Sequence, residues 1–188
     1  WLAASTHPGE EAIAGSVHAA LKVKHSGLLT IIVPRHPDRG EAIAAELRQR
    51  GLVVARRSTC DAIEVSTDTY LADTLGELGT FFAVSPITFM GKSLDKSGGG
   101  HNPIEPIKLG SIVVTGSSWH NFDDFYKALL GAQGAVEVKS GDELTAAIDR
   151  LLTSPDEVAT LRERAAKTVA AMSGGLQASV AALLPLLP

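Results

Sequence analysis

The sequence of 188 residues is poor in several features, and each scarcity excludes a class of protein. A single cysteine, Cys60, cannot form a disulfide within the chain and cannot build a cysteine-rich metal site. Disulfides accumulate in oxidising compartments, so one thiol fits a reducing, cytosolic setting, and we expect Cys60 to be buried or idle. No apolar run reaches the ~18 residues that cross a bilayer, and no signal peptide opens the chain.

Positive charge is also scarce. Lysine and arginine together number 17 against 21 acidic residues, which gives a formal net charge of -4. A chain with this balance has no overall basic field to attract nucleic acid or an anionic membrane surface. We therefore expect no nucleic-acid partner, and any cation that binds a phosphate has to be placed locally. The composition, 45% hydrophobic and 20% charged, is that of one globular domain, which we expect to span residues 1–188.

Two phosphate-binding signatures are missing as well. The first expected strand is followed by "STHPGEE" (5–11), where a nicotinamide-dependent enzyme built of alternating strands and helices would carry G-x-G-x-x-G. The triplet "GKS" (91–93) resembles the end of the NTPase phosphate loop, but Pro86 and Met90 stand where its first glycine region would be needed. The sequence thus favours neither a nicotinamide cofactor nor an NTPase.

Strand-like and helix-like segments alternate along the chain. The segments with strand character cover 1–5, 27–33, 52–57, 67–73, 86–91, 111–116 and 134–139. Helical spacing predicts helices at 10–25, around Ile43 and Leu47 up to Gly51, up to about Val84, and from Asn102. The tail from Asp142 to Pro188 is predicted to be helical throughout, with a boundary at "TSPDE" (153–157), where Ser154 caps Pro155. This order predicts an α/β fold of Rossmann type: a doubly wound parallel sheet of about six strands, helices on both faces and a helical C-terminal tail.

Distinctive residues, most of them polar or glycine, follow the carboxyl ends of the expected strands, which is where sheets of this kind bind ligands. They are Ser5, Thr6 and His7; Pro34, Arg35 and His36; Asp73, Thr74, Gly76 and Glu77; Met90, Gly91, Lys92 and Ser93; and Gly116 with Asn121. Arg35 and His36 stand between two prolines and form either a rigid cationic shelf for a phosphate or an exposed turn.

The stretch "SGGGHNPIEP" (97–106) allows two interpretations. In the first, Asn102 caps a helix, Pro103 takes its first position and Glu105 closes a capping box. That interpretation leaves three conformationally costly glycines unexplained. In the second, the bare backbone lets an anion approach the N–H groups at the helix start. Glu105 could then accept two hydrogen bonds from a ribose diol, a role that is incompatible with capping its own helix.

The histidines divide into two groups. His7, His36 and His101 follow three different strands and could converge on zinc, but no short ligand spacing supports a metal site, and we expect none. His18 and His25 fall on an expected helix, and we predict that both face solvent.

Five motifs in order, "STHPGEE", "PRHPDR", "DTLGEL", "GGGHNPIEP" and "NF" (121–122), resemble the carboxy-terminal half of the Kdo transferases. These enzymes add 3-deoxy-D-manno-octulosonic acid (Kdo) from CMP-Kdo to lipid A precursors in lipopolysaccharide biosynthesis. The resemblance runs from Trp1 to the end of the chain. One departure stands out, because the family usually reads G-G-S where this sequence has Gly91, Lys92 and Ser93. Lys92 adds a cation to this loop.

The resemblance implies one half of a GT-B glycosyltransferase. This domain would hold the donor, CMP-Kdo, whereas an amino-terminal domain with the membrane anchor, the acceptor surface for the lipid A precursor and the general base would lie outside this sequence. The chain alone would then bind CMP or CMP-Kdo without catalysing transfer. The implied reaction is direct displacement with inversion, without metal or other cofactor, at the cytoplasmic face of the bacterial inner membrane. The alternatives are a non-catalytic nucleotide-binding module of Rossmann type and a GT-B enzyme that uses UDP sugars.

The resemblance also implies roles for individual residues. Arg35 and His36 would meet the CMP phosphate. Met90 and Gly91 would line the cytidine pocket, and Glu105 would hold the ribose. The residues that would face the phosphate or the Kdo carboxylate are Asn102, Gly98, Gly99 and Gly100. Further candidates around the same cleft are Thr6, His7, Thr74, Gly76, Glu77, Lys92, Ser93, His101 and Asn121.

Overall fold

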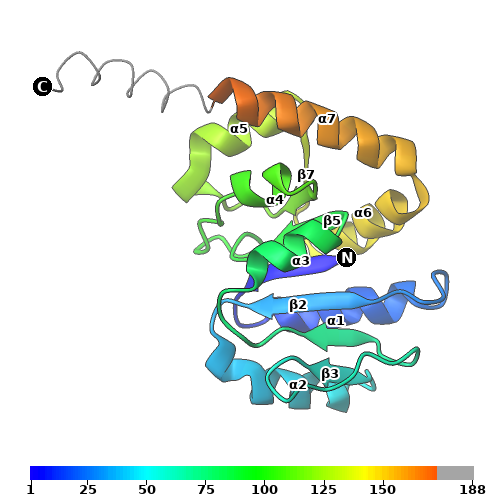
Figure 1. Ribbon diagram of the computed structural model, residues 1–188. Coiled ribbons are helices and arrows are strands. Elements are labelled where there is room, and N and C mark those ends of the chain that lie inside the picture. Colours follow the sequence, from blue (N-terminus) through cyan, green and yellow to red (C-terminus); the bar gives the residue numbers. More distant parts are fainter. Residues whose placement is uncertain (173–188) are drawn as a thin grey trace, which may run out of the picture.

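A seven-stranded parallel sheet forms the centre of the molecule. The computed structural model describes residues 1–172, and Figure 1 shows the sheet with helices packed against it. In spatial order the strands are β3 (Val54–Arg56), β4 (Thr69–Leu71), β2 (Thr30–Pro34), β1 (Leu2–Thr6), β5 (Ile87–Met90), β6 (Ile112–Thr115) and β7 (Ala135–Glu137). Every neighbouring pair is parallel. The predicted fold class is confirmed, with seven strands rather than about six.

Helices cover both faces of the sheet. They are α1 (Glu10–Leu21), η1 (Pro37–Arg39), α2 (Gly40–Gln49), α3 (Leu78–Val84), α4 (Ile104–Lys108), η2 (His120–Phe122), α5 (Asp123–Gly131), α6 (Gly141–Thr153) and α7 (Pro155–Met172), where η marks a 3-10 helix. One apolar cluster lies under α1, α2 and α6 and includes the buried Val17 and Ile148. The other lies under α3, α4 and α5 and includes the buried Phe82 and Leu129. Burial of these two apolar layers supplies the main driving force for folding.

The strand order determines where a ligand can bind. From β1 the chain moves to β2 on one side of the sheet and later returns to β5 on the other side. The loops that leave β1 and β5 therefore diverge toward opposite faces, and a crevice opens between them at the carboxyl ends of the strands. This crevice is the place where the strand-end residues of the sequence should meet.

Several helices and strands are shorter than predicted from the sequence. The helix predicted at 10–25 ends at Leu21, where the chain tightens into a turn in which the Lys24 N–H donates to the Leu21 carbonyl at 2.9 Å. The strands predicted at 52–57 and 67–73 shorten to three residues each, because their outer residues belong to the loops before and after each strand.

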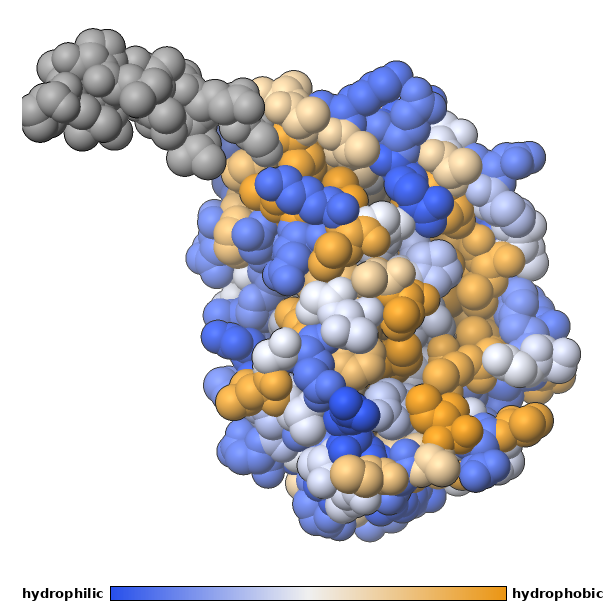
Figure 2. Space-filling model, in the orientation of Figure 1, coloured by the Kyte–Doolittle hydropathy of each residue, from blue (hydrophilic) through white to orange (hydrophobic). Residues whose placement is uncertain are grey.

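Two further predictions concern the tail and the single cysteine. The predicted break in the tail is confirmed, since α6 ends at Thr153 and α7 begins at Pro155. The predicted helix beyond Met172 lies outside the described residues. Cys60 is exposed, in a turn where its own φ is 58°, so it is not a buried thiol. None of the described helices is long and apolar enough to cross a membrane, and Figure 2 shows hydrophilic and hydrophobic side chains interspersed over one face of the molecule.

The two histidines predicted to face solvent are held in polar networks, so that prediction is wrong. His18 has no exposed surface; its Nδ1 lies 2.8 Å from Thr30 Oγ1 and its Nε2 lies 3.1 Å from Asp68 Oδ1. The inner face of α1 carries His18 against the amino end of the sheet, where these polar partners take the place of solvent. His25 follows the helix, is half-buried, and has its Nε2 2.7 Å from Asp149 Oδ1.

Candidate functional site

The loops that follow β1, β2 and β5 meet at the carboxyl end of the sheet. His7 follows β1, His36 follows β2 and His101 precedes α4. The ring centroid of His7 lies 5.9 Å from that of His36 and 5.6 Å from that of His101, on which it stacks. The three histidines from separate strand ends therefore do converge. Within residues 1–172, no group of three or more histidine, cysteine or acidic side chains could hold a metal ion.

Burial and neighbouring positive charge lower the pKa values of two of these rings. Burial lowers the pKa of His101 to about 4, assisted by the charges of His7, Arg35 and Lys92. Burial is also the largest cause of the lowered pKa of His7, to which the charge of Lys92 contributes. The Nε2 atoms of both rings are buried and have no hydrogen-bond partner among the described residues. Such atoms are costly to bury, and they mark a place where a ligand would complete the hydrogen bonding.

Arg35 carries a charge that no acidic side chain of residues 1–172 neutralises. The other arginines near the carboxyl ends of β2, β3 and β4 are each paired with a carboxylate: Arg39 with Glu11, Arg56 with Asp73 and Arg57 with Glu77. Arg35 is exposed, and its backbone N–H donates to the Thr6 carbonyl at 3.0 Å. The backbone therefore holds Arg35 at the crevice while its guanidinium stays available.

The "DTLGEL" loop after β4 is held by hydrogen bonds to the Glu77 carboxylate. Glu77 accepts hydrogen bonds from Arg57 at 2.6 Å and from Thr74 Oγ1 at 2.5 Å. The hydrogen bond from Arg57 lowers the pKa of Glu77 to about 2. Gly76 takes a φ of 84°, a conformation that favours glycine in a turn. A cavity of about 110 Å³ separates this loop from Arg35, so the loop forms the rim of the site.

The N–H groups of glycines 98–100 are all used within the protein. Gly98 donates to the Asp95 carbonyl at 2.9 Å, Gly99 to Ser118 Oγ at 3.0 Å and Gly100 to the Lys92 carbonyl at 2.8 Å. Since none of the three is free, these glycines do not offer N–H groups of their own to an anion.

Close packing of the chain against itself explains why these residues are glycines. A Cβ added to Gly99 would lie 2.5 Å from Asn121 Nδ2, and one added to Gly100 would lie 3.0 Å from the Cα of Trp119. Both glycines also have left-handed φ values, 87° and 71°. The glycine run is thus required by the wall that it builds against the loop after β6.

The start of α4 is a short turn without a capping box. The helix runs from Ile104 to Lys108 with Pro103 at the N-cap, where Asn102 was predicted. Asn102 Oδ1 accepts the Ile104 N–H at 2.9 Å. Glu105 falls on the second helical position, one short of the position that a capping box requires, so that prediction is wrong. Glu105 is exposed, and its carboxylate is available to a ligand.

The loop after β5 forms the floor of the site. Met90 is 2% exposed and packs in the apolar cluster under α3, α4 and α5. A Cβ added to Gly91 would lie 2.6 Å from the Ser5 carbonyl, so this residue lies directly against β1. Ser93 has no exposed surface, and its Oγ accepts the Gly116 N–H at 2.7 Å. These residues shape the site from beneath, and their side chains do not project into it.

Two buried glutamates that the sequence reasoning missed hold these loops together. Glu11 accepts hydrogen bonds from Thr6 Oγ1 at 3.0 Å and from the Arg39 guanidinium. Glu10 accepts the Lys92 N–H at 2.7 Å. In the sequence, these glutamates are visible only as the pair of acidic residues that ends "STHPGEE", and such a pair is also typical of an ordinary helix start.

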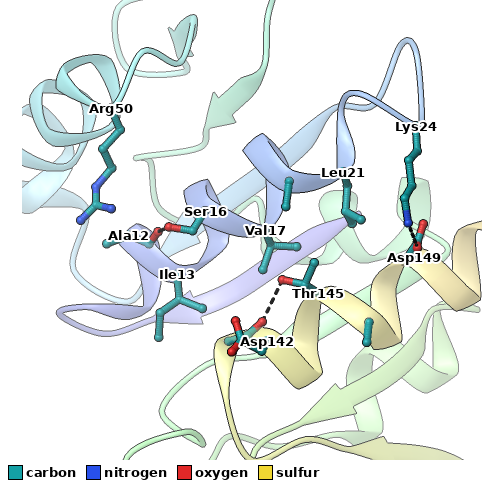
Figure 3. Close-up of a pocket in the computed structure, with 13 residues that line it drawn as sticks. Ala12, Ile13, Ser16, Val17, Leu21, Lys24, Arg50, Asp142, Thr145 and Asp149 are labelled. Carbon is teal, nitrogen blue, oxygen red and sulfur yellow. Dashed lines mark hydrogen bonds and ion pairs between the residues drawn. The ribbon is translucent and has the colours of Figure 1, made fainter.

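A larger groove, of about 690 Å³, lies between α1 and α6, away from the strand ends. Figure 3 shows Ile13 and Val17 of α1 beside Thr145 of α6, with the ion pair of Lys24 and Asp149 at one end. None of the buried, unpartnered polar atoms of the described residues belongs to its walls. The chemistry therefore points to the strand ends as the candidate site.

Two curated relatives of this chain are named as the same kind of enzyme. Over its full length the chain is 38% identical to the 3-deoxy-D-manno-octulosonic acid transferase of Haemophilus influenzae, of which it covers 44%. Over 172 residues it is 38% identical to a probable mitochondrial 3-deoxy-D-manno-octulosonic acid transferase of Arabidopsis thaliana, of which it covers 38%. The chain thus spans less than half the length of these curated relatives. No family model matches the sequence.

A solved structure is similar over most of both chains. It is the crystal structure of the C-terminal CMP-Kdo binding domain of WaaA from Acinetobacter baumannii, with a TM-score of 0.84 and 32% identity. The match covers 89% of this chain and 87% of that one. The similarity therefore extends over most of the fold and is not confined to a single motif.

Proposed function

Since the chain belongs to the 3-deoxy-D-manno-octulosonic acid (Kdo) transferase family, we propose that it is the donor-binding domain of a glycosyltransferase that moves Kdo from CMP-Kdo to a lipid A precursor. The similar WaaA domain is described as a CMP-Kdo binding domain, which supports the same ligand here. In this proposal the acceptor site, the general base and the contact with the cytoplasmic face of the inner membrane belong to parts of the protein that this chain does not include.

The observation that carries the proposal is the set of unpartnered polar groups at the carboxyl end of the sheet. The Arg35 guanidinium has no carboxylate partner within residues 1–172, and the buried Nε2 atoms of His7 and His101 have no hydrogen-bond partner there. A guanidinium forms charge-assisted, often bidentate hydrogen bonds with a phosphate. We assign the CMP phosphate to Arg35, with the exposed His36 beside it.

The rest of the nucleotide is assigned to the wall formed by the loops after β5 and before α4. The exposed Glu105 would accept hydrogen bonds from the ribose diol, because its carboxylate does not cap α4. The cytosine would lie over the floor made by Met90 and Gly91. Asn102 and glycines 98–100 would define the shape of the wall beside the phosphate and the Kdo carboxylate.

The proposed chemistry needs positive charge in this domain. When an acceptor hydroxyl attacks the anomeric carbon of Kdo, a carbon–oxygen bond forms, the bond from that carbon to the phosphate oxygen of CMP breaks, and the electron pair leaves with CMP. Arg35 would stabilise the negative charge of the leaving phosphate. The hydroxyl proton would pass to a base outside this chain. Without acceptor positioning, worth ~7 to 11 kcal/mol of the barrier, the chain alone should not transfer Kdo.

Calorimetric titration of the chain with CMP, UMP and UDP tests the proposal. Preferential binding of CMP is expected. Preference for UDP would instead favour a glycosyltransferase that uses UDP sugars, and the absence of binding to all three nucleotides would overturn the proposal. A parallel assay with CMP-Kdo and a lipid A precursor should show no transfer; turnover by the chain alone would contradict the assignment of the base to another part of the protein.

A further inference from the structure

Glu10 joins two loops of the candidate site through their backbones. The residue is 6% exposed, and its Oε2 accepts the N–H groups of His7 at 2.9 Å and of Lys92 at 2.7 Å. Its Oε1 accepts the Ser93 N–H at 3.2 Å. A carboxylate that accepts several backbone N–H groups in a buried place forms strong, charge-assisted hydrogen bonds. Glu10 therefore fixes the loop after β5 to the loop after β1.

These bonds hold Lys92 in a conformation that few residues with a side chain adopt. Its φ is 57°, in the left-handed region, which is unfavourable for residues other than glycine. Glu10 holds its N–H, and its carbonyl accepts the Gly100 N–H at 2.8 Å. The next residue, Ser93, is bonded both to Glu10 and to Gly116 after β6. The strained residue is thus fixed from both sides.

Lys92 lies between two histidines of the site: its N–H shares Glu10 Oε2 with the His7 N–H, and its carbonyl accepts the N–H of Gly100, the residue before His101. It is half-buried, and no acidic side chain of residues 1–172 forms an ion pair with it. Its charge contributes to the lowered pKa values of both His7 and His101, in keeping with its place between the two rings. A change in the backbone of Lys92 would turn the ammonium away from them, because φ sets the direction in which the side chain leaves the main chain.

We propose that Glu10 is a positioning residue: by holding Lys92 in the left-handed conformation, its carboxylate directs the Lys92 ammonium toward the anionic groups of the bound nucleotide. This inference rests on the proposed function, which makes the site one for a nucleotide phosphate. Glu10 acts only through the loop and does not touch the ligand. Its neighbour Glu11 has other partners, Thr6 and Arg39, so the role belongs to Glu10 alone of the pair.

A double-mutant cycle of Glu10→Gln and Lys92→Gly tests the inference. Glutamine keeps the size of the side chain but offers one acceptor oxygen in place of two, whereas glycine relieves the backbone at residue 92 and removes the ammonium. The matched control is Asp68→Asn, because Asp68 also accepts a backbone N–H, that of Val53 at 2.8 Å, but does so at the amino end of the sheet. Melting temperature and CMP affinity are measured for each variant.

We expect Glu10→Gln and Lys92→Gly each to weaken CMP binding about fivefold, and the double variant to weaken it by about the same factor, because both changes act through one ammonium. Lys92→Gly should also reduce the loss of melting temperature that Glu10→Gln causes. Asp68→Asn should lower the melting temperature and leave CMP affinity unchanged.

Two results would overturn the inference: losses of CMP affinity that add fully in the double variant, or a Glu10→Gln variant that melts early and binds CMP normally. If Glu10→Gln does not fold, Glu10→Asp, which keeps the charge and shortens the reach, takes its place in the cycle. If the unaltered chain binds no CMP, the proposed function fails instead, and the melting temperatures of the cycle still show whether Glu10 supports the backbone of Lys92.

Discussion

The two ends of the sheet use histidine in opposite ways. At the amino end, His18 is fully buried and each of its ring nitrogens has a partner, Thr30 Oγ1 or Asp68 Oδ1. At the carboxyl end, His7 and His101 each have a buried Nε2 without a partner among residues 1–172. A satisfied buried network stabilises and specifies a fold, whereas an unsatisfied one costs stability until a ligand completes it. The histidine at the amino end therefore serves stability, and those at the carboxyl end are available for binding.

Arginine shows the same contrast within the carboxyl end itself. Arg56 donates to the buried Asp73 at 2.8 Å, and Gly40 packs so closely on Asp73 that any side chain there would collide with it. Arg35, which follows β2, two strands away from β3, has no acidic partner within residues 1–172. The paired arginine fixes the loops in place, and the unpaired one is left to meet the ligand.

The largest expected effect is at the amino end. His18→Ala removes the partner of Thr30 and Asp68 and leaves a cavity, and we expect it to lower the free energy of unfolding by about 3 kcal/mol. CMP affinity should not change. The matched variant His7→Ala should cost little stability and should weaken CMP binding. Urea denaturation and calorimetric titration of both variants measure the comparison, and equal losses of stability would contradict it.

The second effect concerns the unpaired arginine. Arg35→Ala should weaken CMP binding about thirtyfold, roughly 2 kcal/mol, because a charge-assisted contact with the phosphate is lost. Lys92→Ala should cost less, about fivefold, since a lysine offers a flexible point charge where arginine offers a planar fork. Titration of both variants with CMP decides between them. Equal or reversed losses would remove Arg35 from its assigned role.

The sequence was sufficient for the architecture because apolar strands alternate with helices along nearly the whole chain, and that order leaves few alternatives to a doubly wound sheet. The burial of His18 could not be predicted in this way. The residue falls on a helix whose pattern looks amphipathic, and its partners Thr30 and Asp68 lie 12 and 50 residues further along the chain. No local sequence pattern predicts a polar network formed by residues so far apart in the chain.

The third effect tests whether Glu105 belongs with the unpartnered groups. Glu105→Gln exchanges a charged acceptor pair for one neutral carbonyl, so CMP affinity should fall about tenfold, the equivalent of ~1.4 kcal/mol. The melting temperature of the ligand-free protein should change little, because Glu105 does not cap α4. A variant that melts early and binds CMP normally would restore a structural role for this residue.

The site was predictable in its location and less so in its details. The rule that ligands bind beyond the carboxyl ends of parallel strands identified the loops that converge. The packing role of the glycine run could not be predicted because its cause is distant: Gly99 and Gly100 pack against Trp119 and Asn121, about twenty residues later in the sequence. The role of Glu10 could not be predicted for a similar reason, since its carboxylate accepts the N–H of Lys92, 82 residues away.

The smallest expected effect is the response of the carboxyl end to pH. The pKa of His101 is lowered from 6.5 to about 4, by burial first and then by the charges of His7, Arg35 and Lys92. Between these two values the unfolded chain binds more protons than the folded one, so the free energy of unfolding is constant above this window and falls as the pH is lowered through it. From pH 7 to pH 6, His101 should account for a loss of only about 0.7 kcal/mol, which His101→Gln should abolish.

Binding should reverse part of this shift. The negative phosphate of CMP opposes the charges of Arg35 and Lys92, so the pKa of His101 should rise when CMP binds, while that of His18, at the other end of the sheet, should stay as it is. NMR titration of the histidine ring protons with and without CMP measures both groups in one sample. A His101 ring that titrates near 6.5 in the free protein would show that it is not buried among cations. Equal CMP-induced pKa shifts at His101 and His18 would contradict the proposal that CMP binds at the carboxyl end of the sheet and not at the amino end.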